Sequence, residues 1–190
     1  MDERILEAAT DLFLKQGFGR TTLDKVSSQA GVGKSGLYGR YSSKESLFEA
    51  VVLRSIATMF EHMVDVSTID EGRPRMQTAG EQLIDGMLHP RCVALMRITA
   101  SEAVTFPHLA KIAYQASFDG SVRYVLKALG KEASEEQAEK TARRFVELVA
   151  QPLSFQAAFG IDPQDLRSRR STITAEAILF LREAGYTTSS

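Results

Sequence analysis

The residues best suited to bind another molecule are basic and hydroxyl side chains between Thr21 and Lys44. The segment from Lys15 to Lys44 has six basic residues and one acidic residue, whereas residues 51–190 have 16 basic and 17 acidic residues. A positive segment on an otherwise nearly neutral chain is typical of a surface that meets phosphates. The whole chain of 190 residues has a formal net charge of −1, so only the uneven distribution of charge points to nucleic acid.

The same segment predicts two short helices joined by a tight turn. The first begins after Thr21, whose hydroxyl would cap it, and ends at Gly31, which tolerates the left-handed backbone of such a turn. The second is expected over residues 34–41, with Leu37 and Tyr41 on one face. This arrangement is a helix-turn-helix, whose second helix enters a major groove of DNA.

The second helix is expected to read the DNA sequence. Lys34, Ser35 and Arg40 project from a face without apolar residues, and we expect them to carry most of the base discrimination. Tyr41 shares a face with Leu37, so core packing and a phosphate contact are equally open for it. The residues expected to contact DNA are Thr21, Thr22, Lys34, Ser35, Gly36, Tyr38, Arg40, Tyr41 and Lys44.

The segment from Ile5 to Leu53 resembles the DNA-binding region of the TetR family of bacterial transcription regulators. The matching residues are Ile5-Leu6-Glu7-Ala8-Ala9, Leu12-Phe13, Gly17-Phe18, Thr21-Thr22-Leu23, Val26, Ala30-Gly31-Val32, Lys34, Leu37-Tyr38, Tyr41 and Ser43-Lys44-Glu45-Ser46-Leu47-Phe48. The resemblance implies an all-helical dimer in which the last two long helices pair, and a pocket in the C-terminal body that accepts an inducer. Residues 95–98 and 101–110 are more faintly similar to one C-terminal subtype of the family.

The second helix departs from the family pattern at several positions. Gly33 stands where the family usually has a serine that caps the helix, and Gly36 and Gly39 stand where it has side chains. Glycines inside a helix cost about 1 kcal/mol each relative to alanine. We therefore expect a helix that is loose until DNA orders it.

Helical spacing continues along the chain and predicts an all-α protein. We expect an N-terminal helix-turn-helix domain over residues 1–46 and a helical ligand-binding and dimerisation domain over 47–190. The expected helices span about 2–16, 22–30, 34–41, a long segment after Ser43, 75–88, 91–104, 107–129, 134–159 with a kink at Pro152, and 171–184. Asp70 to Pro74 is expected to be a loop, Gly130 to end a helix and residues 186–190 to be frayed.

Methionines and aromatic residues of the middle helices are candidates for an effector pocket, because such side chains adapt to varied apolar ligands. Core packing is the alternative for each of them, and a regulator that responds to a protein partner is the alternative for the whole chain. The expected effector is a small apolar or aromatic molecule. The candidate pocket residues are Met59, Phe60, His62, Met63, Met87, Met96, Phe106, Tyr114 and Phe118.

Apolar side chains of the last long helices are expected to form a homodimer interface. Two reading helices would then lie about 34 Å apart and meet a palindromic operator of double-stranded DNA. We expect a repressor that an inducer releases from DNA. The residues expected at the interface are Phe145, Val149, Leu153, Phe159, Ile178 and Leu181.

Other classes of protein fit the sequence poorly. Gly31 to Ser35 resembles half of a P-loop, but Ser28 stands where that motif needs a glycine and no strand is predicted before it. The histidines and Cys92 lack metal-ligand spacing, so we expect no catalytic site, metal or cofactor. No stretch approaches the about 20 apolar residues of a membrane span. A single cysteine fits a reducing compartment, and we expect a cytoplasmic protein.

Overall fold

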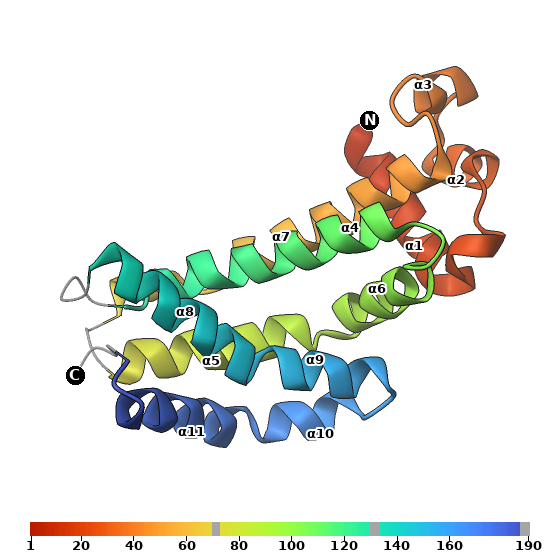
Figure 1. Cartoon of the computed structure of the whole chain (residues 1–190). Coiled ribbons are helices and arrows are strands. Elements are labelled where there is room, and N and C mark those ends of the chain that lie inside the picture. The colour runs from red at the N-terminus through yellow and green to blue at the C-terminus, as the bar shows by residue number, and fades with distance from the viewer. Residues whose placement is uncertain (70–72, 130–133, 187–190) are drawn as a thin grey trace. The chain divides into compact units, whose positions relative to one another are not determined.

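The computed structural model describes residues 1–69, 73–129 and 134–186, and these residues form helices without a strand. The loop expected over Asp70 to Pro74 is shorter than predicted, because residues 73 and 74 already belong to α5. Residues 70–72, the helix end expected at Gly130 and the tail at 187–190 lie outside the described residues. The helices, labelled in Figure 1, are α1 (Asp2–Arg20), α2 (Leu23–Ala30), α3 (Lys34–Tyr38), α4 (Lys44–Glu61), the 3-10 helix η1 (Val66–Thr68), α5 (Arg73–Met87), α6 (Pro90–Ser101), α7 (Pro107–Leu126), α8 (Glu135–Val149), α9 (Gln151–Ala158), α10 (Pro163–Ser168) and α11 (Arg170–Glu183). The all-α prediction is confirmed.

Several predicted helix ends are explained by local chemistry. Gly17 interrupts α1 with a φ of 78°, and Gly31 ends α2 with a φ of 62°, both in the left-handed region that glycine tolerates. Gly185 follows α11 with a φ of 79°. A long helix was predicted after Ser43, and the Ser43 hydroxyl caps the start of α4, since it accepts a hydrogen bond from the Ser46 amide at 3.1 Å.

Other helix ends differ from the prediction. The expected helix over 134–159 is two helices, α8 and α9, which meet at Ala150, and Pro152 lies in the first turn of α9, where a missing N–H does no harm. No helix was predicted between 159 and 171, but residues 163–168 form α10, capped by the Asp162 carboxylate. The reading helix, expected over 34–41, ends at Tyr38.

The described chain divides into two compact units, which differ from the division expected at residue 46. Unit 1 contains residues 1–58 and 94–116, and unit 2 contains residues 59–93 and 117–186 of the described chain. In unit 1 the rings of Phe13, Phe18 and Phe48 pack together, with centroids 4.7 to 5.9 Å apart. Leu95 and Leu109 join the same core, which explains why α6 and the start of α7 belong with the N-terminal helices.

In unit 2, α5 packs against both α8 and α11, which lie beside it in Figure 1. Gly80 of α5 permits this approach, since a Cβ at Gly80 would lie 2.8 Å from the Thr174 hydroxyl oxygen of α11 and 2.9 Å from the Phe145 ring of α8. The bundle is closed by fully buried side chains such as Leu83 and Leu181. Within the described residues, no helix combines the length and apolar content that a membrane span requires.

Candidate nucleic-acid interface

Helices α2 and α3 form the predicted helix-turn-helix. The turn between them is fixed by the Ser27 hydroxyl, which donates to the Val32 carbonyl at 2.7 Å. Val26 and Leu37, one from each helix, are completely buried and join the core of unit 1. Because the segment from Gly31 to Ser35 joins two helices and not a strand to a helix, it does not have the context of a P-loop.

The outer face of α3 is exposed and has few side chains. Lys34, Ser35 and Tyr38 are exposed along the helix, and Arg40 is exposed in the turn that follows it. Arg40 therefore extends from the segment between α3 and α4, and not from the helix on which it was expected. Gly36 lies on the same short helix without a side chain, so four side chains dominate this face.

Thr21 does not lie where the sequence predicted. Its side chain is 0% exposed, and its hydroxyl donates to the Gly17 carbonyl at 2.9 Å and accepts a hydrogen bond from the Gln16 amide at 3.2 Å. Thr22, and not Thr21, caps α2, because its hydroxyl accepts from the Lys25 amide. Thr21 thus secures the end of α1, and Thr22 is the exposed hydroxyl that remains a candidate for DNA contact.

Lys44 has a structural role that the sequence did not indicate. Its ammonium group donates to the Phe18 carbonyl at 3.0 Å and to the Gly19 carbonyl at 3.4 Å, and it lies 4.2 Å from the centroid of the Phe18 ring. These contacts tie the start of α4 to the end of α1. The DNA contact expected of Lys44 stays a prediction.

Two aspartates pair with the cations of the α3 region, and neither pairing was predicted from the sequence. The Lys34 ammonium lies 2.8 Å from the Asp24 carboxylate, and the Arg40 guanidinium lies 3.2 Å from the Asp2 carboxylate. The Tyr41 hydroxyl also donates to Asp2, at 3.2 Å. The hydrogen bond to Asp24 raises the pKa of Lys34 above its ordinary value, while partial burial, together with Asp2, raises the pKa of Tyr41.

The residues expected to line an effector pocket are distributed over both units. Met96, Phe106 and Tyr114 belong to unit 1, where the Phe106 ring packs against Phe18 with centroids 5.3 Å apart and Tyr114 is exposed. Met59, Phe60, His62, Met63, Met87 and Phe118 belong to unit 2.

Within unit 2, several of these side chains pack against glycines of neighbouring helices. A Cβ at Gly86 would lie 2.8 Å from Met63 Cε and 2.9 Å from Met59 Cγ, and a Cβ at Gly120 would lie 2.8 Å from Phe60 Cζ. These residues thus fill space against backbone, as core side chains do. Their role in binding an effector stays a prediction.

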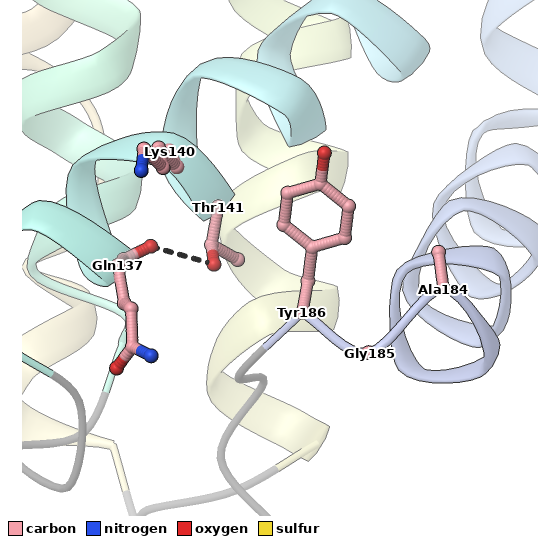
Figure 2. A pocket seen from close by; sticks show the side chains of 6 residues that line it. All are labelled: Gln137, Lys140, Thr141, Ala184, Gly185 and Tyr186. Atoms are coloured by element: carbon pink, nitrogen blue, oxygen red, sulfur yellow. Dashed lines mark hydrogen bonds between the residues drawn. The ribbon is translucent and has the colours of Figure 1, made fainter.

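A hollow in unit 2 lies elsewhere. Its volume is about 310 Å³. Figure 2 shows the residues that line it, on α8 and at the end of α11. The Thr141 hydroxyl within it already donates to the Gln137 carbonyl at 2.9 Å. Its lining is Gln137, Lys140, Thr141, Ala184, Gly185 and Tyr186, which includes none of the predicted pocket residues.

Most of the residues predicted for a dimer interface are buried inside the single chain. These residues are Phe145, Val149, Leu153, Ile178 and Leu181, each at most 3% exposed. They form the apolar stripes by which α8, α9 and α11 pack within unit 2. Within one protomer they are thus core residues, and their place in a dimer interface stays a prediction. Phe159 is different, since 77% of its surface is exposed.

Unit 2 has further exposed apolar side chains that were not predicted from the sequence. They lie outside the apolar stripe that packs inward, on sides of the helices where polar residues are expected. On α11, Leu179 and Phe180 lie off the buried stripe of Ala177, Ile178 and Leu181 and are exposed. Phe155 of α9 is exposed beside Phe159, with the two ring centroids 4.6 Å apart. In the sequence, the signal for such residues is a helix whose apolar positions extend beyond the one stripe that packs inward.

Comparisons with known proteins agree with this fold and with an N-terminal helix-turn-helix domain. Residues 5–51 match a family model described as bacterial regulatory proteins of the tetR family. Residues 74–184, more than half of the chain, match a model described as the AefR-like transcriptional repressor C-terminal domain. Residues 95–98 and 101–110, which resemble one C-terminal subtype of the family, lie within this matched segment.

A curated relative is the HTH-type transcriptional activator FasR of Mycolicibacterium smegmatis, 30% identical over 139 residues, which are 70% of this chain and 63% of FasR. The chain therefore spans less than two thirds of that relative. A solved structure of a putative TetR-family regulator from Mesorhizobium loti superposes with a TM-score of 0.78 at 18% identity, covering 94% of this chain and 95% of that one. The flavonoid-responsive regulator FrrA superposes with a TM-score of 0.73 at 24% identity, covering 96% and 95%. The chain belongs to the TetR family of DNA-binding transcriptional regulators.

Proposed function

We propose that this chain forms a homodimer that binds a palindromic operator and represses transcription until a small molecule releases it. The proposed DNA contacts come from Thr22, Lys34, Ser35, Tyr38 and Arg40, with Lys44, Tyr41 and the backbone at Thr21 and Gly36 at the margin. The observation that carries the proposal is the division of α3 into a buried face at Leu37 and an exposed cationic face. A helix held in this way can enter a major groove without losing its core contacts.

Repression is the proposed mode because the matched C-terminal family model is described as a repressor. The relative FasR is described as an activator, which makes activation the direct alternative. A reporter gene placed behind the DNA that flanks this gene distinguishes the two modes. Deletion of the regulator raises expression if it represses and lowers expression if it activates.

The effector is proposed to be a small apolar or aromatic molecule. The similarity to a flavonoid-responsive regulator supports an aromatic compound, and the methionines of unit 2 can change rotamers to admit one. A panel of apolar and aromatic compounds tested by thermal melting identifies it, since a ligand at 100 times its dissociation constant stabilises by about 2.7 kcal/mol. If no compound raises the melting temperature, regulation by a protein partner replaces this proposal.

The test of DNA binding is a footprint on the DNA flanking the gene, followed by the Arg40→Ala variant. If Arg40 reads a guanine, the variant loses about 1–3 kcal/mol on the operator and much less on unrelated DNA. An equal loss on all sequences would assign Arg40 to a phosphate. Failure of the wild-type protein to bind any duplex at low salt, where phosphate contacts are strongest, would overturn the proposed operator binding.

A further inference from the structure

Lys34 and Arg40, two cations proposed to contact DNA, are already paired with aspartates of the same chain. Asp24 reaches Lys34 from the first turn of α2, and Asp2 reaches Arg40 from the start of α1. The N-terminal end of α1 also lies close to α3, since a Cβ at Gly36 would be 3.8 Å from the Met1 sulfur. The pairing at Arg40 is therefore part of a larger contact between the start of α1 and the α3 region.

Both ion pairs are exposed and exchangeable. The side chains of Lys34 and Asp24 are 65% and 55% exposed, and those of Arg40 and Asp2 are 46% and 53% exposed. Exposed pairs of this kind contribute little to stability. A carboxylate and a phosphate oxygen accept the same charge-assisted hydrogen bonds from an ammonium or guanidinium group. A phosphate that binds Lys34 or Arg40 must therefore either displace the carboxylate or share the cation with it.

We propose that Asp2 and Asp24 are positioning residues that compete with DNA for Arg40 and Lys34 and so lower the affinity of the free protein for duplex DNA. This inference rests on the proposed role of α3 in reading DNA. Each aspartate acts through its own cation, and not through general repulsion of phosphates. Removal of the Asp24 charge therefore frees Lys34, and removal of the Asp2 charge frees Arg40 and the Tyr41 hydroxyl that donates to the same carboxylate.

The experiment measures binding of the full-length protein to a fluorescent duplex of mixed sequence by anisotropy at low salt. Asp2→Asn and Asp24→Asn are each expected to raise the affinity about two- to fivefold, which is the range of an exposed ion pair. Asp11→Asn is the matched control, because Asp11 is an exposed aspartate of the same helix as Asp2 and makes no ion pair with any other described residue. It changes the net charge equally and is expected to raise affinity much less.

Double variants separate competition from general charge effects. In the Arg40→Ala background, Asp2→Asn is expected to give no more than the Asp11→Asn gain, and Asp24→Asn is expected to behave likewise in the Lys34→Ala background. Thermal melting of each variant checks that the fold is retained. We expect it to be retained because the substituted side chains are exposed.

The outcomes distinguish this inference from the proposed function. Three results would overturn the competition while leaving operator binding intact. They are a gain in DNA affinity that persists after the cation is removed, a gain no larger than that of Asp11→Asn, and no gain at all. Absence of DNA binding by the wild-type protein would overturn both. Gains that disappear with the paired cation support the inference.

Discussion

Truncation of Phe159 to alanine is expected to weaken the proposed dimer strongly without disturbing the fold of the protomer. Phe159 follows α9 with 77% of its surface exposed, so the single chain leaves most of its hydrophobic free energy unused. Burial of a whole phenylalanine side chain contributes about 2 kcal/mol. The exposed fraction leaves about 1.5 kcal/mol per protomer for a partner to gain.

Symmetry doubles this contribution. In a twofold dimer the same surface of both protomers lies in the interface, so each substitution is counted twice. Phe159→Ala is then expected to cost about 3 kcal/mol of association free energy, which raises the dimer dissociation constant roughly 100-fold. Phe155, whose ring packs beside Phe159, is expected to give a similar effect when truncated.

Sedimentation equilibrium over a range of protein concentrations measures this dissociation constant directly. Val104→Ala is the control, since Val104 is 95% exposed but belongs to unit 1 and is not among the residues proposed for the interface. It should leave the dissociation constant unchanged. Circular dichroism of the dilute Phe159→Ala protein checks that the protomer keeps its helices.

Two results would refute this reasoning at different levels. A dissociation constant that changes less than about threefold, well below the factor expected from the exposed area, would remove Phe159 from the interface. A wild-type protein that stays monomeric at every concentration would refute the dimer itself. A weakened dimer that also loses operator affinity, because two linked reading helices are needed, would support the whole arrangement.

Two further variants test the core of unit 2 by urea unfolding. Gly80→Ala is expected to lower the free energy of unfolding by about 1–3 kcal/mol through overpacking, because its Cβ would lie 2.9 Å from the Phe145 ring. Gly19→Ala is the control and should not destabilise the protein, because a Cβ there would have no atom within 4 Å. Equal stability of the two variants would contradict the close packing at Gly80. Tyr124→Phe is expected to cost about 0.5–1.5 kcal/mol at neutral pH by removing the hydrogen bond that its hydroxyl donates to the Val64 carbonyl at 2.8 Å. Burial raises the pKa of Tyr124 from 10.0 to about 12, so the contribution of the neutral phenol is complete below pH 10 and is lost as the pH rises toward 12, and the variant should lose less stability over that interval.

The sequence predicted those parts of the fold that depend on local chemistry. The breaks at Gly17 and Gly31 follow from the backbone freedom of glycine, and the start of α4 follows from the hydroxyl of Ser43. Each of these signals acts within a few residues. For that reason they could be located before any tertiary contact was known.

The sequence did not predict which apolar residues are left free to meet a partner. Val149 and Phe159 both lie on the expected last helices, and their side chains are both apolar, yet one is fully buried and the other is mostly exposed. The difference depends on which face of α8 and α9 packs within unit 2. That choice is made by contacts with elements such as α5 and α11, which are distant in the sequence from α8.

The candidate interface was predicted by residue type but not by pairing. The excess of basic over acidic residues between Lys15 and Lys44 suggested cations without partners. Asp2 lies outside that segment, and it pairs with Arg40 only because the fold brings the start of α1 beside the segment that follows α3. A count of charges along the chain cannot detect such a partner. The net charge available to DNA is thus smaller than the sequence implies, and it depends on whether two carboxylates are displaced.

The missing side chain at Gly36 of α3 has a physical cause unrelated to these ion pairs. If Gly36 were alanine, the atom nearest to its methyl group would be 3.8 Å away, an ordinary contact, so packing within the chain does not require glycine there. The helix nevertheless forgoes about 1 kcal/mol of intrinsic stability relative to alanine at that position. A glycine at this half-buried position leaves room for another molecule to approach the backbone of α3. Under the proposed function that molecule is DNA, which would lie closest to α3 at Gly36 and be contacted from either side by Ser35 and Arg40.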